Sequence, residues 1–412
     1  MTPSLTLDDI RAARGRIAGR VLRSPCPRSI PLSELVGADV FCKLDLLQRT
    51  GSFKERGACN ALMMLDADRR ARGVVAASAG NHALGLAYHG TLLGIPVTVV
   101  MPRFAPLVKV ATCRRLGAKV ILEGDTFDDA RRLAAEIADR EGLERIHGFD
   151  DPRVIAGQGT MGLEILDDVP DVDAVVVPTG GAGLLAGVAL AVKTLRPATQ
   201  IVSVETAAAP SFGASLAAGR PTRVSIRPTL ADGLAVGRVG DLPFAIAAPL
   251  VDRVITVDEG DLSLAVLRLL ELEKTVVEGA AAAALAAVMG GRCPDLAGRR
   301  VAILLCGGNI DLTILDRVID HGLAVDGRRW RFAARISDRP GGIARLTAAI
   351  AAAGASVREI VHDRAFSGAD VFSTAVEVTV ETSGHDHVAS LAGALAAEGF
   401  AIEPVAHAAG RP

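Results

Sequence analysis

Short apolar runs alternate with longer amphipathic segments through most of the chain. Each run has the length of a strand and is followed by a segment with helical periodicity. A further stretch, residues 264–288, has the pattern of one long helix. Strands buried on both faces of a parallel sheet give such continuous apolar runs, so the pattern predicts an open, doubly wound α/β body. The runs span residues 73–78, 96–102, 118–124, 173–181, 200–205, 254–258 and 299–309.

The pattern changes after His321, where a short polar link leads into a separate series of elements. A strand, a helix, two strands, a helix and a strand are predicted, which is the βαββαβ order of a ferredoxin-like module. We therefore predict two domains, 1–327 and 328–412, with a smaller subdomain of about residues 41–150 inserted in the first. The elements of the second domain cover residues 329–336, 341–355, 356–364, 373–382, 387–399 and 400–405.

Composition narrows the classes of function. Of the 412 residues 50% are hydrophobic, and no uninterrupted apolar run has membrane-spanning length, so a soluble globular protein without a membrane partner is predicted. A formal net charge of -2 with dispersed basic residues offers no electrostatic footprint for nucleic acid. Residues 1–17 lack the apolar segment of a secretory signal, and the six cysteines form no CxxC pair. We expect a cytoplasmic protein with small-molecule partners.

Candidate chemistry lies in four loops where a predicted strand ends or a helix begins, as ligands of open α/β sheets bind outside the carboxyl ends of strands. The first loop, residues 48–58 with the sequence QRTGSFKERGA, sets Lys54 at a predicted helix start behind Gly51 and Ser52. A partly desolvated lysine near the positive end of a helix has a lowered amine pKa, which suits Schiff-base formation. A solvated surface lysine is the alternative for this residue taken alone.

The second loop, residues 78–85 with the sequence SAGNHALG, follows an apolar run and opens a helix. Its small residues leave backbone N–H groups exposed at the helix N-terminus, an arrangement suited to a carboxylate. Asn81 adds a neutral amide that can orient a ring hydroxyl or a substrate. An ordinary turn with Asn81 as the helix cap is the alternative.

The third loop, residues 178–187 with the sequence PTGGAGLLAG, joins an apolar run to a helix. Its glycines let the backbone wrap around a phosphate at the positive end of the helix. A dinucleotide fingerprint is the competing interpretation, because Glu205 lies about 20 residues further on, where a ribose-binding acid would sit. The spacing of Gly181, Gly183 and Gly187 is one residue longer than GxGxxG, so we favour the phosphate loop.

The fourth loop, residues 304–309 with the sequence LLCGGN, places Cys306 at the end of an apolar run. A neutral thiol there can hydrogen-bond the nitrogen of an aromatic ring without protonating it strongly. A buried cysteine that only packs in the core is the alternative.

Together the four loops resemble the fold-type II family of pyridoxal-phosphate enzymes, specifically the serine/threonine dehydratases, over roughly residues 5–320. The resemblance implies a tryptophan-synthase-β-like fold and pyridoxal 5'-phosphate as cofactor, carried in a Schiff base by Lys54 beside Phe53. It also implies that Asn81 contacts the ring 3-hydroxyl and that Cys306 faces the pyridine nitrogen. The implied phosphate site is Gly180, Gly181, Ala182, Gly183 and Leu184. The implied substrate carboxylate site is Ser78, Ala79, Gly80, Asn81 and His82.

The reaction that the resemblance implies is an α,β-elimination. Lys54 removes the Cα proton, the cofactor ring stabilises the negative charge, and the β-hydroxyl leaves, which yields a 2-oxo acid and ammonia. Serine racemases that resemble this sequence carry a second serine where this chain has Ala79, so we favour a dehydratase, with Ser78 as a catalytic or carboxylate-binding residue. Related racemases bind a divalent cation near the position of Glu205, but Ser211 stands where an acid is expected, so no metal site is predicted.

The C-terminal domain bears on the choice of substrate. Residues 335–364 resemble the start of an ACT domain, with the D-R-P-G turn at residues 338–341. The resemblance implies an allosteric site for an amino acid such as isoleucine or valine, or contacts within a homodimer or homotetramer. Such regulation suits a committed step of isoleucine biosynthesis, so L-threonine, converted to 2-oxobutanoate, is the predicted substrate. Serine or 3-hydroxyaspartate as substrate, a non-catalytic amino-acid sensor and a nicotinamide dehydrogenase are the alternatives.

Overall fold

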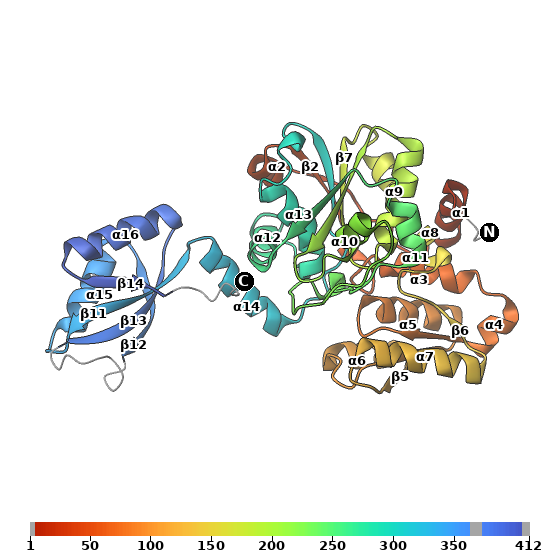
Figure 1. Cartoon of the computed structure of the whole chain (residues 1–412), viewed down its shortest axis with the longest axis horizontal. Coiled ribbons are helices and arrows are strands. Elements are labelled where there is room, and N and C mark those ends of the chain that lie inside the picture. The colour runs from red at the N-terminus through yellow and green to blue at the C-terminus, as the bar shows by residue number, and fades with distance from the viewer. Residues whose placement is uncertain (1–4, 363–372, 406–412) are drawn as a thin grey trace. The chain divides into compact units, whose positions relative to one another are not determined.

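The computed structural model describes residues 5–362 and 373–405. Contacts between residues divide the chain into two units, Met1–Asp311 and Leu312–Pro412. The helices and strands of each unit carry their labels in Figure 1.

The division between the units lies earlier in the chain than the predicted boundary at residues 327 and 328. Helix α14 (Leu312–Val325) contacts strand β11 (Arg329–Ser337), and an ion pair joins the two elements. In the sequence, α14 has the pattern of one more helix after a strand of the first domain, so the periodicity alone places the boundary after it.

The larger sheet of the first unit has six strands in the order β1-β2-β10-β7-β8-β9. Neighbouring strands are parallel except that β1 runs antiparallel to β2. Helix α13 (Gly279–Met289) contacts β7 to β10, helix α9 (Gly183–Leu195) contacts β7, and Figure 1 shows helices on both sides of the sheet. This burial explains the continuous apolar runs. The strands are β1 Arg28–Ser29, β2 Asp39–Lys43, β7 Ala174–Pro178, β8 Gln200–Thr206, β9 Arg253–Val257 and β10 Arg300–Leu304.

The smaller sheet of the first unit has four parallel strands in the order β5-β4-β3-β6. All four come from the part of the chain between β2 and β7, so this subdomain is an insertion in the larger one. The strands are β3 Val74–Ala77, β4 Val97–Met101, β5 Lys119–Leu122 and β6 Glu144–Arg145. The helices in this part of the chain are α3 Lys54–Met63, α4 Ala67–Arg72, α5 Asn81–Leu93, α6 Leu107–Arg115 and α7 Phe127–Glu141.

Helix α3, which begins at Lys54, packs closely against α8 (Pro152–Asp168). A Cβ atom added at Gly157 would lie 2.5 Å from the carbonyl oxygen of Arg56, so the two backbones approach at a distance that only glycine allows. The position of Lys54 is therefore fixed by backbone packing against α8. The other helices of the first unit are α1 Leu7–Ile17, α2 Ile30–Val36, α10 Ser211–Ala218, α11 Asp241–Ala247 and α12 Glu259–Leu272, with 3-10 turns η1 Asp45–Leu47, η2 Asp232–Leu234 and η3 Pro294–Leu296.

The single long helix predicted over residues 264–288 is wrong. The structure has two helices, α12 and α13, with a break between them in which Lys274 has a φ of 54° and Glu278 is extended. Both segments are rich in helix-forming Leu and Ala, so the periodicity gave no sign of the break. The backbone N–H of Glu278 donates to the carbonyl of Gly307, a contact distant in sequence that holds the break in place.

The second unit has the predicted βαββαβ order. Its four antiparallel strands are arranged as β12-β13-β11-β14, and its core includes Phe332, Leu346, Val378 and Leu391. The end of the third predicted element, residues 363–364, lies outside the described residues. The remaining elements are α15 Gly342–Ala352, β12 Ser356–His362, β13 Ser373–Glu381, α16 His385–Ala397 and β14 Ala401–Pro404.

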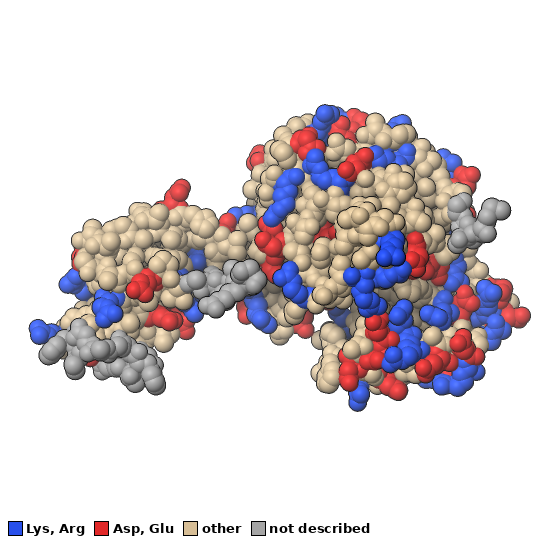
Figure 2. All heavy atoms as spheres, in the orientation of Figure 1, with Lys and Arg blue, Asp and Glu red and all other residues tan. Residues whose placement is uncertain are grey.

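The surface carries acidic and basic side chains of both signs, interspersed over the face of each unit shown in Figure 2. This arrangement agrees with the small net charge of the sequence. Among the described residues, no helix has both the length and the apolar character that crossing a membrane requires.

Candidate active site

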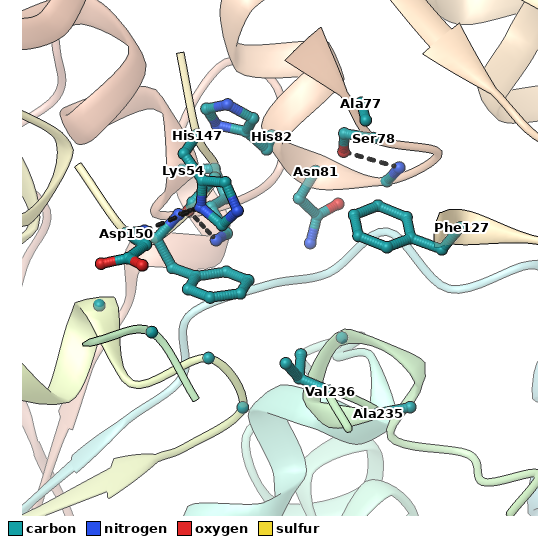
Figure 3. Close-up of a pocket in the computed structure, with 18 of the residues that line it drawn as sticks. Lys54, Ala77, Ser78, Asn81, His82, Phe127, His147, Asp150, Ala235 and Val236 are labelled. Atoms are coloured by element: carbon teal, nitrogen blue, oxygen red, sulfur yellow. Dashed lines mark hydrogen bonds between the residues drawn. The ribbon is translucent and has the colours of Figure 1, made fainter. Parts of the chain in front are cut away.

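All the site residues predicted from the sequence line one cavity of about 1000 Å³ in the first unit. Both subdomains contribute to it. Figure 3 shows Lys54, Ser78 and Asn81 on one side of the cavity and Ala235 and Val236 on the opposite side. The predicted residues that line it are Phe53, Lys54, Ser78, Ala79, Gly80, Asn81, His82, Gly180, Gly181, Ala182, Gly183, Leu184 and Cys306.

The turn that carries Lys54 is tied to the loop that carries Cys306. The backbone N–H of Phe53 donates to the carbonyl of Cys306 at 2.9 Å, and that of Gly308 donates to the carbonyl of Gly51 at 2.9 Å. Gly51 has a φ of 76°, a conformation that glycine adopts without strain. These bonds bring the first and fourth loops of the sequence together.

A cluster of four buried charges lies behind the lysine turn: Lys43, Asp45, Arg56 and Glu164, hereafter the charged cluster. The guanidinium of Arg56 donates to Asp45 at 2.6 and 2.7 Å and to Glu164 at 2.7 and 2.8 Å. The Nζ of Lys43 donates to Glu164 at 2.6 Å. Two cations and two carboxylates balance, and each carboxylate is shared or held by two bonds, which makes the burial of these charges tolerable.

Lys54 has a different environment from the charged cluster. Its Nζ donates to the carbonyl oxygen of Gly148 at 2.7 Å and lies 5.1 Å from the centroid of the Phe53 ring. No carboxylate of the described residues forms an ion pair with it. Burial therefore lowers the pKa of Lys54 to about 8, against smaller opposing effects of Cys306 and Glu278. The lowered pKa predicted from the sequence is confirmed, with burial as its main cause.

The second loop opens helix α5, which begins at Asn81. The backbone N–H of Gly80 donates to the Ser78 hydroxyl at 3.3 Å, a bond drawn in Figure 3. The N–H groups of Ala79, Asn81 and His82 find no acceptor among the described residues. Burial lowers the pKa of His82 to about 3, so its ring is neutral, with Nε2 3.2 Å from the carbonyl oxygen of Ile146. The loop therefore offers neutral donors at a helix N-terminus, which suits a carboxylate.

The third loop opens helix α9. The backbone N–H groups of residues 180–185 find no acceptor among the described residues, whereas the N–H of Ala186 bonds the carbonyl of Ala182. Ala182 has a φ of 68°, the left-handed region that disfavours a side chain. A Cβ atom at Gly181 would collide with the ring of Phe149. The loop is thus a row of free donors at the positive end of a helix, where an anion is stabilised.

Cys306 follows strand β10 and is buried. Burial raises the pKa of its thiol, with a smaller contribution in the same direction from Glu278. The thiol therefore keeps its proton at neutral pH and presents a weak, uncharged hydrogen-bonding group to the cavity.

Comparison with known proteins gives a consistent result. Residues 17–307 match the family model described as pyridoxal-phosphate dependent enzyme. That match covers more than half of the chain. This chain belongs to the pyridoxal-phosphate dependent enzymes. The α/β fold type II predicted from the four loops is confirmed by the structure and by this match, and the nicotinamide dehydrogenase alternative is wrong.

Three relatives of this pyridoxal-phosphate dependent enzyme illustrate the range of its similarity. It is 44% identical to the L-threonine ammonia-lyase of Thermotoga maritima over 97% of this chain and 100% of that protein. The processed form of threonine deaminase isoform 2 from Solanum lycopersicum has a TM-score of 0.73 and 36% identity over 76% of this chain and 92% of that one. Maize serine racemase has a TM-score of 0.74 and 34% identity over 78% of this chain and 98% of that one.

The cavity of this pyridoxal-phosphate dependent enzyme fits its cofactor. The free N–H groups of residues 180–185 can hold the phosphate, and the Lys54 amine, with a carbonyl as its hydrogen-bond partner, can react with the aldehyde. The uncharged Cys306 thiol can face the ring nitrogen. The donors, the nucleophile and the neutral partner that the cofactor needs therefore line the same cavity.

The structure also brings residues into the cavity to which sequence analysis gave no role. Glu278, Gly148 and Phe149 line it, and Asn309 contacts its wall through Asn81. Glu278 matches a glutamate near the active site of the family that the sequence resembles, but the sequence gave it no role; Gly148 contributes only a backbone carbonyl, which leaves no signal in a sequence. Asn309 was visible at the end of the fourth loop, but nothing in the sequence showed its partner.

Glu205 at the end of strand β8 is a buried carboxylate outside this cavity. It accepts backbone hydrogen bonds from Phe212 at 2.5 Å and Gly213 at 2.8 Å. Burial raises the pKa of Glu205 to about 7 despite these bonds. No group of three or more His, Cys, Asp or Glu side chains among the described residues is placed to hold a metal ion.

Proposed function

We propose that this enzyme is an L-threonine ammonia-lyase, which converts L-threonine to 2-oxobutanoate and ammonia. The observation that carries the proposal is the 44% identity to the Thermotoga maritima L-threonine ammonia-lyase over 97% of the chain. The fold alone does not choose between reactions, because a threonine deaminase and a serine racemase are both similar to it. Ala79 supports elimination over racemisation, since its methyl group has no proton to exchange with Cα.

Lys54 is the proposed base. Its lowered pKa leaves far more of the amine uncharged near neutral pH than in an ordinary lysine, and a free amine can take up the Cα proton. Pyridoxal phosphate, when bound, supplies an electron sink for the pair left behind on Cα. Loss of that proton and of the β-hydroxyl removes one water, and hydrolysis of the resulting imine returns it and releases ammonia. Atoms therefore balance without a further reactant.

The proposed substrate site is the start of α5. The carboxylate can be held by the Ser78 hydroxyl and by the backbone N–H groups of Ala79, Asn81 and His82. The His82 ring is neutral, so these donors bind the carboxylate without a charged side chain in the loop. Binding of the carboxylate at this helix end fixes one substituent of Cα. The substrate can then be oriented so that its Cα proton points at Lys54.

Cys306 is the proposed partner of the ring nitrogen. A thiol with a raised pKa neither carries a charge nor gives up its proton readily, so it does not stabilise a protonated ring. A ring held in this way favours elimination over reactions that need full protonation of the nitrogen, such as transamination.

Release of 2-oxo acid and ammonia tests the proposal. The purified enzyme, loaded with pyridoxal phosphate, is given L-threonine, L-serine and the 3-hydroxyaspartate isomers in parallel, with Lys54→Ala as the inactive control. We expect the highest kcat/KM with L-threonine. A higher value with serine or 3-hydroxyaspartate would reassign the substrate, and no turnover of any of them would overturn the proposed reaction.

We further propose that the second unit is an ACT-like module that binds isoleucine or valine and regulates the enzyme. Its antiparallel βαββαβ sheet supports this, as does the turn at residues 338–341, where Gly341 has a φ of 97° and open space beside its Cα. Calorimetric titration of the full chain with isoleucine and valine, with alanine as the control ligand, tests it. The absence of both binding heat and any change in threonine kinetics would contradict the proposal.

We also propose a cytoplasmic homodimer or homotetramer that serves isoleucine biosynthesis. The six cysteines are free and buried, which suits a reducing compartment. Phe104, Leu107 and Val108 are strongly exposed apolar residues, as expected where a surface is covered by another subunit. Light scattering of the purified chain gives the oligomeric state directly, and a monomer would contradict this proposal.

A further inference from the structure

The side chain of Asn81 is held from two sides. Its Nδ2 donates to both carboxylate oxygens of Glu278, at 2.9 and 3.1 Å, and its Oδ1 accepts from Nδ2 of Asn309 at 2.9 Å. The two partners lie far from Asn81 in the sequence and come from the break before α13 and the loop after β10. One amide therefore joins three separate parts of the cavity wall.

Glu278 is placed for this contact by the break between α12 and α13. Its side chain is 6% exposed, and none of the described cations forms an ion pair with it. Gly307 makes room for the carboxylate, because a Cβ atom at that position would collide with Glu278 Oε1. A buried carboxylate without a cation is costly, so hydrogen bonds from Asn81 and from the backbone of Asn309 have to hold it.

Asn309 is fixed in turn. Besides Asn81, its Nδ2 donates to the carbonyl oxygen of Thr50 at 2.7 Å. A Cβ atom at Gly51 would collide with the Asn309 side-chain oxygen, so the lysine turn is shaped to receive this amide. Both N–H donors of Asn309 thus have acceptors, and the group cannot rotate without losing a hydrogen bond.

These contacts give the two ends of the Asn81 amide different partners. A rotation that exchanged its oxygen and nitrogen would set an oxygen against the Glu278 carboxylate and an NH2 group against the NH2 group of Asn309. Both new pairs would repel. Because the two oxygens of one carboxylate lie close together, a single N–H of Asn81 is shared between them, and the second N–H at the same end remains for another acceptor.

We propose that Glu278 and Asn309 are positioning residues for the cofactor, because they hold the Asn81 amide in the one orientation that offers an N–H to the ring hydroxyl oxygen of pyridoxal phosphate. An N–H aimed at that oxygen favours its ionised form. The inference rests on the cofactor site of the family and on no particular substrate. Cofactor binding and the absorption spectrum can therefore test it without threonine turnover.

A double-mutant cycle on the dissociation constant of pyridoxal phosphate separates action through Asn81 from general damage. Fluorescence titration compares the wild type, Glu278→Ala, Asn81→Ala and the double variant. Glu278→Ala is expected to weaken binding about tenfold in the wild-type background, as for a hydrogen bond to a charged group, and less than about twofold when Asn81 is already alanine. An equal loss in both backgrounds would overturn the proposal.

Glu205→Gln is the matched control. Glu205 is, like Glu278, a buried carboxylate with a raised pKa, but it does not line the cavity. Its substitution is expected to leave the dissociation constant within about twofold of the wild type. Glu278→Met keeps the length of the side chain, removes both acceptor oxygens, and takes the place of Glu278→Ala in the cycle if the alanine variant does not fold.

The spectrum at saturating cofactor supplies a second readout, which a merely structural role would not move. Glu278→Ala and Asn309→Ala are expected to lower the fraction of bound cofactor that absorbs in the visible range, because the ring hydroxyl loses its fixed donor. Unchanged spectra in both variants would overturn the proposal. A wild type without any visible band would instead contradict the cofactor assignment, so the two failures are distinct, and both differ from a failure to use threonine.

Discussion

Lys43 and Lys54 lie on either side of the same turn, but the partners of their amines differ. Lys43 belongs to the charged cluster, where Glu164 accepts from its Nζ at 2.6 Å. Lys54 faces the cavity with the carbonyl of Gly148 as its partner, and its pKa is lowered to about 8. Lys43 is completely removed from water and Lys54 partly so. The two sites differ in whether the amine has a carboxylate as its partner.

The same contrast holds for the carboxylates. Asp45 and Glu164 are bound by Arg56, and that cation holds the pKa of Asp45 below its usual value against the effect of burial. Glu278 on the cavity wall has no cation, and burial raises its pKa to about 7. Paired charges fix the position of the turn. The unpaired groups Lys54 and Glu278 have pKa values near neutral pH, where they gain or lose a proton. The distinction separates groups whose charge is fixed by a partner from groups whose charge can change near neutral pH.

Loss of the unpaired lysine should have the largest effect on activity. Lys54→Met is expected to lower kcat at least about 10³-fold, because a positioned base contributes about 10²–10⁴-fold and the point of attachment of the cofactor is lost as well. Stability without cofactor should be unchanged or higher, since an unpaired buried amine is replaced by an apolar chain of similar length. Steady-state kinetics and urea denaturation of the same preparation check both parts. A marked loss of stability would contradict the contrast with Lys43.

Loss of the paired Arg56 should lower stability, in contrast to loss of Lys54. Arg56→Met is expected to lower the free energy of unfolding by about 3–5 kcal/mol, because Asp45 and Glu164 are left buried without their common cation. Urea denaturation of the protein without cofactor measures the change, and Arg56→Lys, which keeps the charge but not the forked geometry, should lose less. A change below about 1 kcal/mol for Arg56→Met would show that the charged cluster does not hold the turn.

The unpaired carboxylates should contribute a fall in stability with rising pH, opposite in sign to the rise that His82 contributes because its folded-state pKa of about 3 lies below the ordinary value of 6.5. Glu205 and Glu278 have folded-state pKa values of about 7 against an ordinary value of 4.5, so the folded state keeps protons that the unfolded state has lost. Their contribution is complete below about pH 4.5 and is lost as the pH rises to about 7, by on the order of 3 kcal/mol for each group.

Denaturation of the protein without cofactor across this range measures the slope. Glu205→Gln should remove the negative contribution of Glu205 to the slope, although the absolute stability also falls, because an NH2 group then faces the backbone N–H of Phe212 or Gly213. A slope identical to that of the wild type would rule out Glu205 as its source. The charged cluster should add little to the slope, which sharpens the contrast between paired and unpaired groups.

The smallest effect concerns the backbone of the third loop. Ala182 has a φ of 68°, and relief of this strain in Ala182→Gly is expected to raise the free energy of unfolding by up to about 1 kcal/mol, less the entropy gained by the unfolded chain. Thermal unfolding compares the two proteins, with Ala186→Gly inside α9 as a control that should destabilise. A clear loss of stability in Ala182→Gly would mean that packing of the Ala182 methyl group stabilises the fold by more than the backbone strain destabilises it.

The sequence was informative wherever a local pattern carries the signal. Alternating strand and helix runs predicted β3 to β5 and β7 to β10 of the first unit, but not β1, β2 or β6, and the same periodicities predicted the strands of the second unit. The four loops around Lys54, Asn81, Gly181 and Cys306 were each recognisable because small residues next to one reactive or polar side chain leave a short, contiguous signature. All four meet at one cavity.

The sequence failed where the signal depended on a distant partner. The break before Glu278 lies between two segments that both favour helix, and it is held by the carbonyl of Gly307. The sequence did not show that the four residues of the charged cluster meet, because Lys43, Asp45, Arg56 and Glu164 come from a strand, a turn and two helices. The unit boundary was misplaced because a helix shows its own periodicity and not which neighbour it packs against.

The sequence by itself determined the classes of element, the four loops and the chemical character of the groups in them. These are properties of adjacent residues, which steric preferences and solvation set locally. Only the tertiary structure decided which charges meet an opposite charge. Arg56 finds two carboxylates, whereas Lys54, two residues earlier, finds the carbonyl of Gly148. Burial lowers the pKa of Lys54, whereas the carboxylates beside Arg56 raise the pKa of its guanidinium against the effect of burial, and these partners are brought together by packing across the whole fold.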